Sequence, residues 1–253
     1  MKEPIFSHEE CERYARHFVM PEIGGPGQQK LKKSHVLMIG AGGLGAPALQ
    51  YLAAAGVGEI SIVDDDTVDL SNLQRQVIHT TESVGIRKSD SAKKAIEAIN
   101  PHVIVHAIAD RLTQENAEVL ICDKTVVLDG SDNFDTRYLV ADICELAQVP
   151  LITAAVNKFD GSITTLKPWA VNESGHLFPR YRDLFPEQPS DGLLPKCSEV
   201  GVMGAVTGIM GTLQAMECIK EVVDIGDSLV GKLLMLDGLA MRFQTISYKR
   251  PEK

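Results

Sequence analysis

The chain has 253 residues, of which 44% are apolar and 23% charged, and its formal net charge is −9. This length and composition allow one large α/β domain or two small ones. The acidic balance argues against a nucleic-acid partner, because binding to a phosphate backbone needs a basic surface. The charged start MKEPIFSHEE is unlike a secretory signal, and every long apolar run is interrupted by polar residues, so no membrane span is predicted.

In the first half of the chain, predicted strands alternate with predicted helices. A short helix over 9–22 comes first, and we expect the glycines of GGPGQQK to break it. The strand at 59–64 is apolar and β-branched with little polar alternation, which is typical of a strand buried on both faces of a parallel sheet. We predict the other strands at 36–40, 102–107, 125–129 and 150–155, and helices at 43–56, 89–100, 113–122 and 134–148.

The alternation stops after this point. A strand at 161–166 is predicted to pair differently, and the proline-rich segment 168–195 is predicted to be a loop. A long helix at 199–223 and a final hairpin of strands at 232–237 and 242–249 follow. We therefore predict an α/β fold: a Rossmann-like, mainly parallel sheet with helices on both faces, extended by a mixed or antiparallel C-terminal half. We expect a single domain over 1–253, with its nucleotide-binding half at about 30–156 and the remainder at about 157–253.

The five cysteines form no C-x-x-C pair. Their odd number and irregular spacing support neither a disulfide framework nor a thiolate zinc site. A reducing cytoplasm is the location that this usage favours. The cysteines are Cys11, Cys122, Cys144, Cys197 and Cys218.

A glycine-rich turn follows the first predicted strand of the alternating region. Gly40, Gly42 and Gly45 have the G-x-G-x-x-G spacing, with a strand before them and a helix after them. This arrangement lets the backbone turn tightly and approach a phosphate, whose charge the helix N-terminus stabilises. We therefore predict a nucleotide site. The alternative is a tight glycine turn that binds no ligand.

Asp64 ends the next strand, about where a ribose-binding acid lies in dinucleotide-binding folds. On that ground alone, an NAD-dependent oxidoreductase is an alternative function. The polar segment that follows adds Arg75, Arg87 and Lys88, however. A pyrophosphate already lies on a helix end, so further cations favour a triphosphate. Each of these cations has an alternative interpretation as a solvated surface charge, which is strongest for Arg87.

The DGSDN sequence places Asp132 just past the carboxyl end of the strand at 125–129. Ligands bind at this edge of an open parallel sheet. A carboxylate beside phosphates there is a natural Mg²⁺ ligand. The alternative is that Asp129 or Asp132 caps the helix that begins near Phe134.

Longer motifs together resemble the MoeB/ThiF/HesA adenylyltransferases, bacterial relatives of ubiquitin-activating enzymes. The motifs are GAGGLG, VDDDTVDLSNLQRQ, Lys88 with SDSAKKAIEAINP, DGSDN and CSEVGVMGAVTGIMGTLQAMECIK. NLQRQ and C-x-E-x-G-V are far more specific than the glycines, and the resemblance covers about residues 8–250. It implies an enzyme that binds ATP and Mg²⁺, adenylates the C-terminal Gly-Gly carboxylate of a ubiquitin-like sulfur carrier of the MoaD/ThiS type, and releases pyrophosphate.

The resemblance also implies roles for individual residues. Gly43 would contact the phosphates, Asp64 the ribose and Asp132 the Mg²⁺ ion. Arg16, in ERYARHF, matches an arginine that reaches the phosphates from the partner subunit of a homodimer. Cys197 matches a cysteine that in some members forms a covalent link during sulfur transfer and in others does not. The residues implied to hold the triphosphate are Asn72, Arg75 and Lys88.

Many members of this family hold zinc with two C-x-x-C pairs, and both pairs are missing from this sequence. The first pair would fall at Arg180 and Asp183. The sequence instead resembles the zinc-free, MoeZ-like branch, so we expect no zinc. Members of that branch often add a C-terminal rhodanese domain, which this sequence lacks, so we expect a separate sulfur donor. The segment 168–195 would be a crossover loop over the carrier's tail.

Two other classes of function remain as alternatives to carrier adenylation. One is the NAD-dependent oxidoreductase, and the other is a non-catalytic nucleotide-binding partner subunit. The carrier and its pathway stay open at this point, since molybdopterin, thiamine and cysteine biosynthesis all use such carriers.

Overall fold

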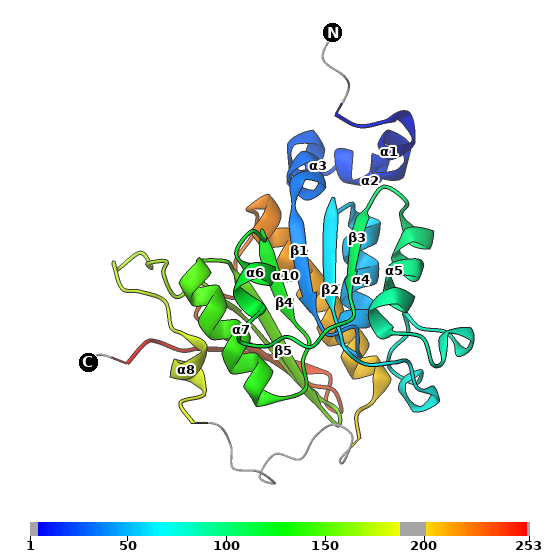
Figure 1. Cartoon of the computed structure of the whole chain (residues 1–253). Helices are drawn as coiled ribbons and strands as arrows, with labels where there is room; N and C mark the ends of the chain where they lie inside the picture. Colours follow the sequence, from blue (N-terminus) through cyan, green and yellow to red (C-terminus); the bar gives the residue numbers. More distant parts are fainter. Residues whose placement is uncertain (1–4, 188–200, 252–253) are drawn as a thin grey trace.

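The computed structural model describes residues 5–187 and 201–251. Its centre is one eight-stranded sheet with the order β3-β2-β1-β4-β5-β6-β7-β8 (Figure 1). The pairs among the first five strands along the chain are parallel, and the remaining pairs are antiparallel. The strands are β1 (His35–Ile39), β2 (Glu59–Val63), β3 (Ile104–Ile108), β4 (Val126–Asp129), β5 (Leu151–Asn157), β6 (Asp160–Leu166), β7 (Lys232–Asp237) and β8 (Arg242–Ser247).

Helices cover both faces of this sheet, and each face has its own apolar core. One core joins alternate residues of the strands to α3 (Gly24–Lys33), α4 (Gly45–Ala55), α5 (Lys88–Ile99) and α10 (Gly204–Val223). The other core joins the opposite strand residues to α6 (Ala117–Ile121), α7 (Phe134–Ala147) and α8 (Tyr181–Leu184). The predicted fold class is confirmed, and the predicted C-terminal hairpin corresponds to β7 and β8.

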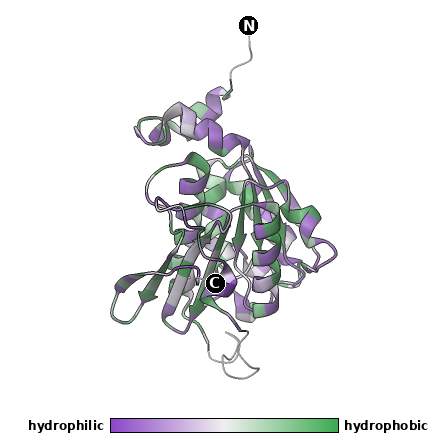
Figure 2. Ribbon diagram, turned by 90° about the vertical axis from the view of Figure 1, so that its left-hand side faces the viewer, coloured by the Kyte–Doolittle hydropathy of each residue, from purple (hydrophilic) through white to green (hydrophobic). Residues whose placement is uncertain are grey.

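The N-terminal helical region differs from its prediction. Two short helices, α1 (His8–Arg13) and α2 (Ala15–Phe18), replace the single helix, and the GGPGQQK segment begins α3 instead of breaking structure. Pro26 lies in the first turn of α3, where a missing N–H costs no intrahelical bond. A Cβ at Gly27 would lie 3.0 Å from Val223 Cγ1, so glycine lets α3 approach the end of α10. Figure 2 shows these helices, largely hydrophilic, at one end of the molecule.

Two other helices are shorter than predicted. The side chain of Asn116 accepts a hydrogen bond from the Thr113 amide, which makes 113–116 a turn and delays the start of α6 to Ala117. The last helix begins at Gly204 rather than at 199, and 199–200 lie outside the described residues. In the described part of the chain, none of the helices combines the length and apolar character that a membrane span requires.

Candidate functional site

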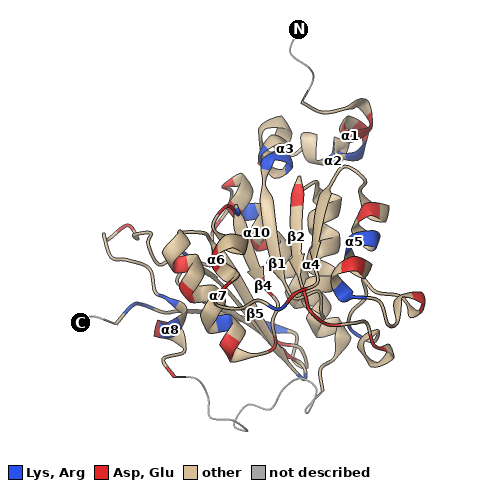
Figure 3. Cartoon of the chain, viewed as in Figure 1, with Lys and Arg blue, Asp and Glu red and all other residues tan. Residues whose placement is uncertain are grey.

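A cavity of about 1700 Å³ opens at the carboxyl ends of the parallel strands. It lies where the strand order reverses between β1 and β4, the usual ligand position in open α/β sheets. Figure 3 shows acidic and basic residues together on the loops at this end of the sheet. Eight lining residues were predicted to belong to the site: Gly40, Gly42, Gly43, Asp64, Asn72, Arg75, Lys88 and Asp132.

The glycine turn between β1 and α4 is built by close backbone contacts. Gly40 has a φ of +89°, a conformation that a side chain disfavours. A Cβ at Gly45 would lie 2.0 Å from the Gly40 carbonyl oxygen, so only glycine fits there. Gly45 therefore shapes the turn without lining the cavity. The amino end of α4 points into the cavity behind this turn, the arrangement that favours a phosphate.

The backbone N–H and carbonyl of Ala41 are both held by side chains from other segments. Its N–H donates to Asp64 Oδ2 at 2.8 Å, and its carbonyl accepts from His79 Nε2 at 2.9 Å. Since the carbonyl only accepts, Nε2 carries the proton, and His79 Nδ1 accepts from the Ser91 hydroxyl at 2.9 Å. His79 is 5% exposed, and burial lowers the pKa of its imidazole. A neutral histidine thus fixes the turn.

Asp64 ends β2, and its carboxylate faces the cavity. Its Oδ1 also accepts from the Asp66 amide at 2.9 Å. Burial raises the pKa of Asp64, while the Lys88 ammonium and the two backbone N–H groups lower it. The carboxylate is therefore fixed against the glycine turn, at the position predicted for a ribose-binding acid.

Lys88 is the first residue of α5 and only 6% exposed. Its ammonium lies 2.7 Å from Asp66 Oδ2, and its backbone N–H donates to the Asp66 carbonyl at 2.9 Å. A buried lysine that lines a cavity is a cation already removed from bulk water, and such cations interact strongly with anions. Its alternative interpretation as a solvated surface charge is wrong.

Arg75 and Asn72 come from the loop after β2. Asn72 Oδ1 accepts from the Asp69 amide at 3.2 Å and closes a short 3₁₀ turn, η1 (Leu70–Asn72). Arg75 is half-buried and lines the cavity, and one guanidinium nitrogen donates to the Ser71 carbonyl at 3.3 Å. Arg87, in contrast, is exposed, does not line the cavity itself and donates to the Asp65 carbonyl. The loop therefore turns Arg75 toward the cavity and Arg87 outward.

The two aspartates of DGSDN have different environments. Asp129 is 1% exposed and accepts from the Ser131 hydroxyl at 2.6 Å and the Thr153 hydroxyl at 2.8 Å. Asp132 is exposed, lines the cavity and has no partner among the described residues. Neither caps α7, because Asn133 takes that position and accepts from the Thr136 amide at 2.9 Å. The capping alternative is thus wrong, and of these two carboxylates only that of Asp132 has no partner among the described residues.

Three lining or supporting residues were missed by the sequence analysis. Arg137 lines the cavity and donates to the carbonyls of Ser131 (2.7 Å) and Ala154 (3.2 Å). Gln76 also lines the cavity, and its buried Oε1 has no hydrogen-bond partner in the part of the chain described. The third is His79. The signal for Arg137 was its place in the first turn after DGSDN, on the binding edge of the sheet.

Two predicted site residues lie elsewhere. Arg16 is exposed on α2, which Figure 1 places at the opposite end of the sheet from the cavity loops. It does not line the cavity of its own chain. Cys197 lies outside the described residues. Of the other cysteines, Cys144 and Cys218 are buried, and burial raises the pKa of both thiols.

Arg180 and Asp183, which stand at the first missing cysteine pair, contact each other. Asp183 Oδ1 lies 3.1 Å from Arg180 Nη2, and Asp183 Oδ2 accepts from the Arg180 amide at 2.8 Å. This pair begins α8, and Tyr181 packs edge-to-face on Tyr138 of α7 with 5.3 Å between ring centroids. The aromatic packing, together with the ion pair of Arg182 with Asp142 at 2.6 Å, therefore holds this segment to α7.

Comparisons with known proteins identify the family of this chain. The ThiF family model matches residues 14–253. The chain is 45% identical to the SAMP-activating enzyme E1 of Haloferax volcanii, covering 95% of this chain and 86% of that protein. It is 43% identical to the sulfur carrier protein adenylyltransferase of Thermus thermophilus, covering 97% and 90%. It is 46% identical to the probable adenylyltransferase/sulfurtransferase MoeZ of Mycobacterium tuberculosis, covering 96% and 62%.

Solved structures share the fold at lower identity. A crystal structure of PaaA superposes with a TM-score of 0.81 at 23% identity, covering 99% of this chain and 77% of that one. Escherichia coli MccB crystallised with ATP superposes with a TM-score of 0.80 at 20% identity, covering 94% and 72%. The family match and the relatives above 40% identity decide the assignment: the chain belongs to the ThiF family.

Proposed function

We propose that this protein adenylates the C-terminal carboxylate of a ubiquitin-like sulfur carrier with ATP and releases pyrophosphate. Close relatives are named as enzymes that activate or adenylate such carriers. The observation that carries the proposal is the cavity itself, which the buried Lys88 and the half-buried Arg75 line together with the glycine turn at the amino end of α4. Two fixed cations beside a phosphate turn suit a triphosphate better than a pyrophosphate.

Each residue has a role in this proposal. Gly42 and Gly43 leave room for phosphates at the amino end of α4, and the Asp64 carboxylate accepts from ribose hydroxyls. Arg75 and Lys88 neutralise the triphosphate, and Asn72 offers its amide N–H₂ to the same group. In the chemical step, a carrier carboxylate oxygen bonds to the α-phosphorus while the bond to the bridging oxygen breaks. The carboxylate is already ionised, so no side chain needs to act as a base.

Asp132 is the residue that we propose to hold Mg²⁺. Its carboxylate lines the cavity and has no partner among the described residues, whereas the Asp129 carboxylate is already occupied by hydroxyl groups. Mg²⁺ takes one or two carboxylates together with phosphate oxygens, and it supplies further neutralisation of the leaving pyrophosphate. We expect no zinc, since an ion pair of Arg180 with Asp183 stands where the first cysteine pair would be.

The proposal also includes a second subunit and a sulfur-transfer step. We propose a homodimer in which Arg16 reaches the partner's cavity, because within its own chain Arg16 lies far from the site. Cys197 is proposed to take part in sulfur transfer, with a separate protein as sulfur donor. The reducing cytoplasm favoured by the cysteine usage suits that chemistry.

The test is exchange of labelled pyrophosphate into ATP in the presence of a carrier that ends in Gly-Gly. We expect exchange that requires the carrier and disappears with a carrier lacking its last glycine. Exchange that is independent of the carrier, or absent with every carrier of this type, would refute the proposal.

Titration calorimetry with ATP·Mg²⁺ and with NAD tests the oxidoreductase alternative, and we expect binding of ATP only. A non-catalytic subunit would bind ATP without any exchange.

A further inference from the structure

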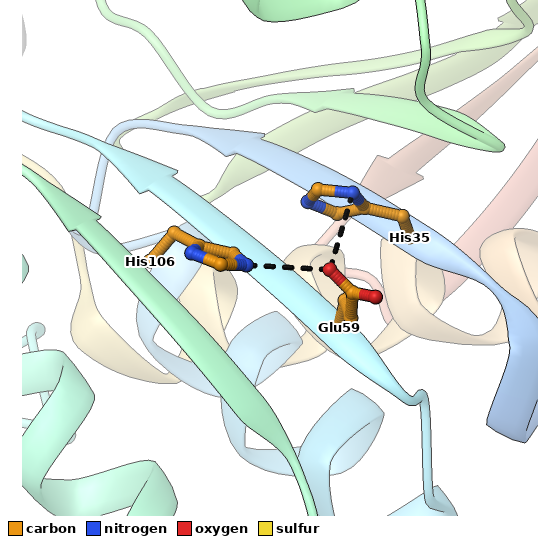
Figure 4. A group of neighbouring side chains, drawn as sticks. All are labelled: His35, Glu59 and His106. Atoms are coloured by element: carbon orange, nitrogen blue, oxygen red, sulfur yellow. Dashed lines mark hydrogen bonds and ion pairs between the residues drawn. The ribbon is translucent and has the colours of Figure 1, made fainter.

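Three side chains with metal-binding atoms meet on the sheet, away from the cavity. They are His35 on β1, Glu59 on β2 and His106 on β3, and Figure 4 shows both imidazoles turned toward the Glu59 carboxylate. One ligand atom from each residue lies within 4.8 Å of the others. Histidine and carboxylate together are the donor set of many zinc sites in proteins.

The sheet register brings these residues together. His35 is the direct partner of Glu59 in the β1–β2 ladder, and His106 is the partner of Ser61 in the β2–β3 ladder. Because residues two apart on a strand point to the same face, all these side chains share one face. In Figure 1, α6 and α7 lie over β4 and β5 and leave β2 and β3 uncovered on that face.

The separations of the two histidine nitrogens from the Glu59 carboxylate suit a small metal ion. Glu59 Oε2 lies 3.6 Å from His35 Nδ1 and 3.3 Å from His106 Nε2. Ligands at about 2.0–2.1 Å in a tetrahedral zinc site lie about 3.3–3.4 Å from one another. The His35 contact is longer than a hydrogen bond. The distance from His35 Nδ1 to the Glu59 carboxylate is therefore close to that between two ligands of one zinc ion, and no hydrogen bond joins the two atoms.

A neighbouring hydroxyl orients the first histidine. His35 Nε2 lies 2.8 Å from the buried Ser61 hydroxyl, which can accept an Nε2 proton and so leave the Nδ1 lone pair for a metal ion. Metal-binding histidines regularly donate their other ring nitrogen in this way. Lys124, whose charge acts on His35, is paired with Asp123, and the Asp123 carboxylate offsets its repulsion of a metal ion. The three side chains are 20%, 44% and 46% exposed, so an ion has a path from solvent.

We propose that His35, Glu59 and His106 form a surface site for a borderline transition-metal dication, for which Zn²⁺ is the probe. Water would complete the coordination. Nitrogen ligands favour such ions over Mg²⁺, so this site would not compete for the ion of the nucleotide cavity. His35 lies four residues before Ile39 at the cavity, a distance of about 13 Å along an extended strand. A bound ion would join the edge strand β3 to β1 and β2 and stabilise the sheet.

The experiment is calorimetric titration of Zn²⁺ into the full chain after treatment with chelator, together with thermal unfolding. We expect a site of one ion per chain and a rise in Tm with Zn²⁺. Glu59→Gln and His106→Ala should each weaken the affinity at least tenfold and remove most of the rise in Tm. The matched control is His102→Ala, because His102 Nε2 lies 3.4 Å from Glu9 without a third ligand; its affinity should be unchanged.

A spectroscopic readout separates this site from binding elsewhere. In imidazole ¹H–¹⁵N NMR spectra, Zn²⁺ should shift His35 and His106 and leave the other histidines in place. Circular dichroism of each variant checks that the fold is kept. Zn²⁺ affinity that is unaffected by Glu59→Gln and His106→Ala overturns the proposal, as does an affinity that is lost when the exposed thiols of Cys11 and Cys122 are alkylated.

Discussion

The ammonium of Lys88 and the carboxylate of Asp66 lie 2.7 Å apart, the lysine buried and the aspartate 67% exposed. Asp66 therefore forms an ion pair with the lysine that we propose to bind the triphosphate. Because the Asp66 side chain is exposed, it can rotate into solvent at little cost, while the buried stem of Lys88 stays in place. The pair holds the Lys88 ammonium in position before a nucleotide binds.

Two substitutions separate the lysine's role from that of its partner. Lys88→Met should abolish pyrophosphate exchange, because it removes a buried cation from the phosphate site. Asp66→Asn should bind ATP more tightly, by up to about fivefold, because a mostly exposed ion pair contributes about 0.2–1 kcal/mol and no longer competes. The measurement is ATP affinity by calorimetry beside exchange rates. Weaker ATP binding in Asp66→Asn would mean that the pair supports the site instead of competing for it.

The glycine turn offers a matched pair of alanine variants. Gly45→Ala should lower the free energy of unfolding by about 1–3 kcal/mol or more, because its Cβ would lie 2.0 Å from the Gly40 carbonyl oxygen. Gly42→Ala meets nothing nearer than 3.6 Å, so its stability should be close to that of the parent. Gly42 lines the cavity, however, so this variant should lose ATP affinity. Urea unfolding and ATP titration check both; equal stabilities would contradict the tight packing at Gly45.

His79 gives the stability of the protein a defined pH dependence. Its folded pKa is below the unfolded value of about 6.5, so between the two the unfolded chain binds more protons. The contribution of His79 to the free energy of unfolding is therefore complete above about pH 6.5, and it decreases as the pH falls below that value. Burial also lowers the pKa of His35, so both histidines contribute to the slope.

His79→Gln isolates this contribution, since its amide can still donate to the Ala41 carbonyl. Between pH 7.5 and 5, roughly the span around the unfolded histidine pKa, the variant should lose less stability than the parent. Urea unfolding at a series of pH values measures the two slopes. Identical slopes would show that His79 is not kept neutral by the fold.

The parallel half of the fold was predictable from local patterns, and the supports of its site were not. Apolar runs such as 59–64 and the glycine spacing after β1 are visible within short windows of sequence. The bond between His79 and Ala41 joins residues 38 positions apart, and nothing around His79 signals its burial. The GGPGQQK helix was missed for a similar reason, since Gly27 packs against Val223 near the other end of the chain.

The same contrast applies to the two aspartates of DGSDN, and it gives a direct test of the Mg²⁺ proposal. Asp132→Asn should retain the parent's stability, because the carboxylate has no partner among the described residues, and it should abolish exchange. Asp129→Asn should lose about 1–3 kcal/mol of stability, because its buried carboxylate accepts from Ser131 and Thr153. Chemical unfolding and exchange assays at saturating Mg²⁺ compare the two. Full exchange activity in Asp132→Asn would remove its proposed role.

Arg16 tests whether the site is shared between subunits. Arg16→Ala should fold normally, because the side chain is exposed on α2, but should lose exchange activity. Mixed and re-equilibrated with inactive Lys88→Met, it should recover about a quarter of the parent's activity, since half the dimers then hold one site with both residues intact. Without re-equilibration the mixture should stay inactive. If Arg16 instead acts within its own chain, no mixed dimer contains a complete site, and the activity stays absent in both mixtures.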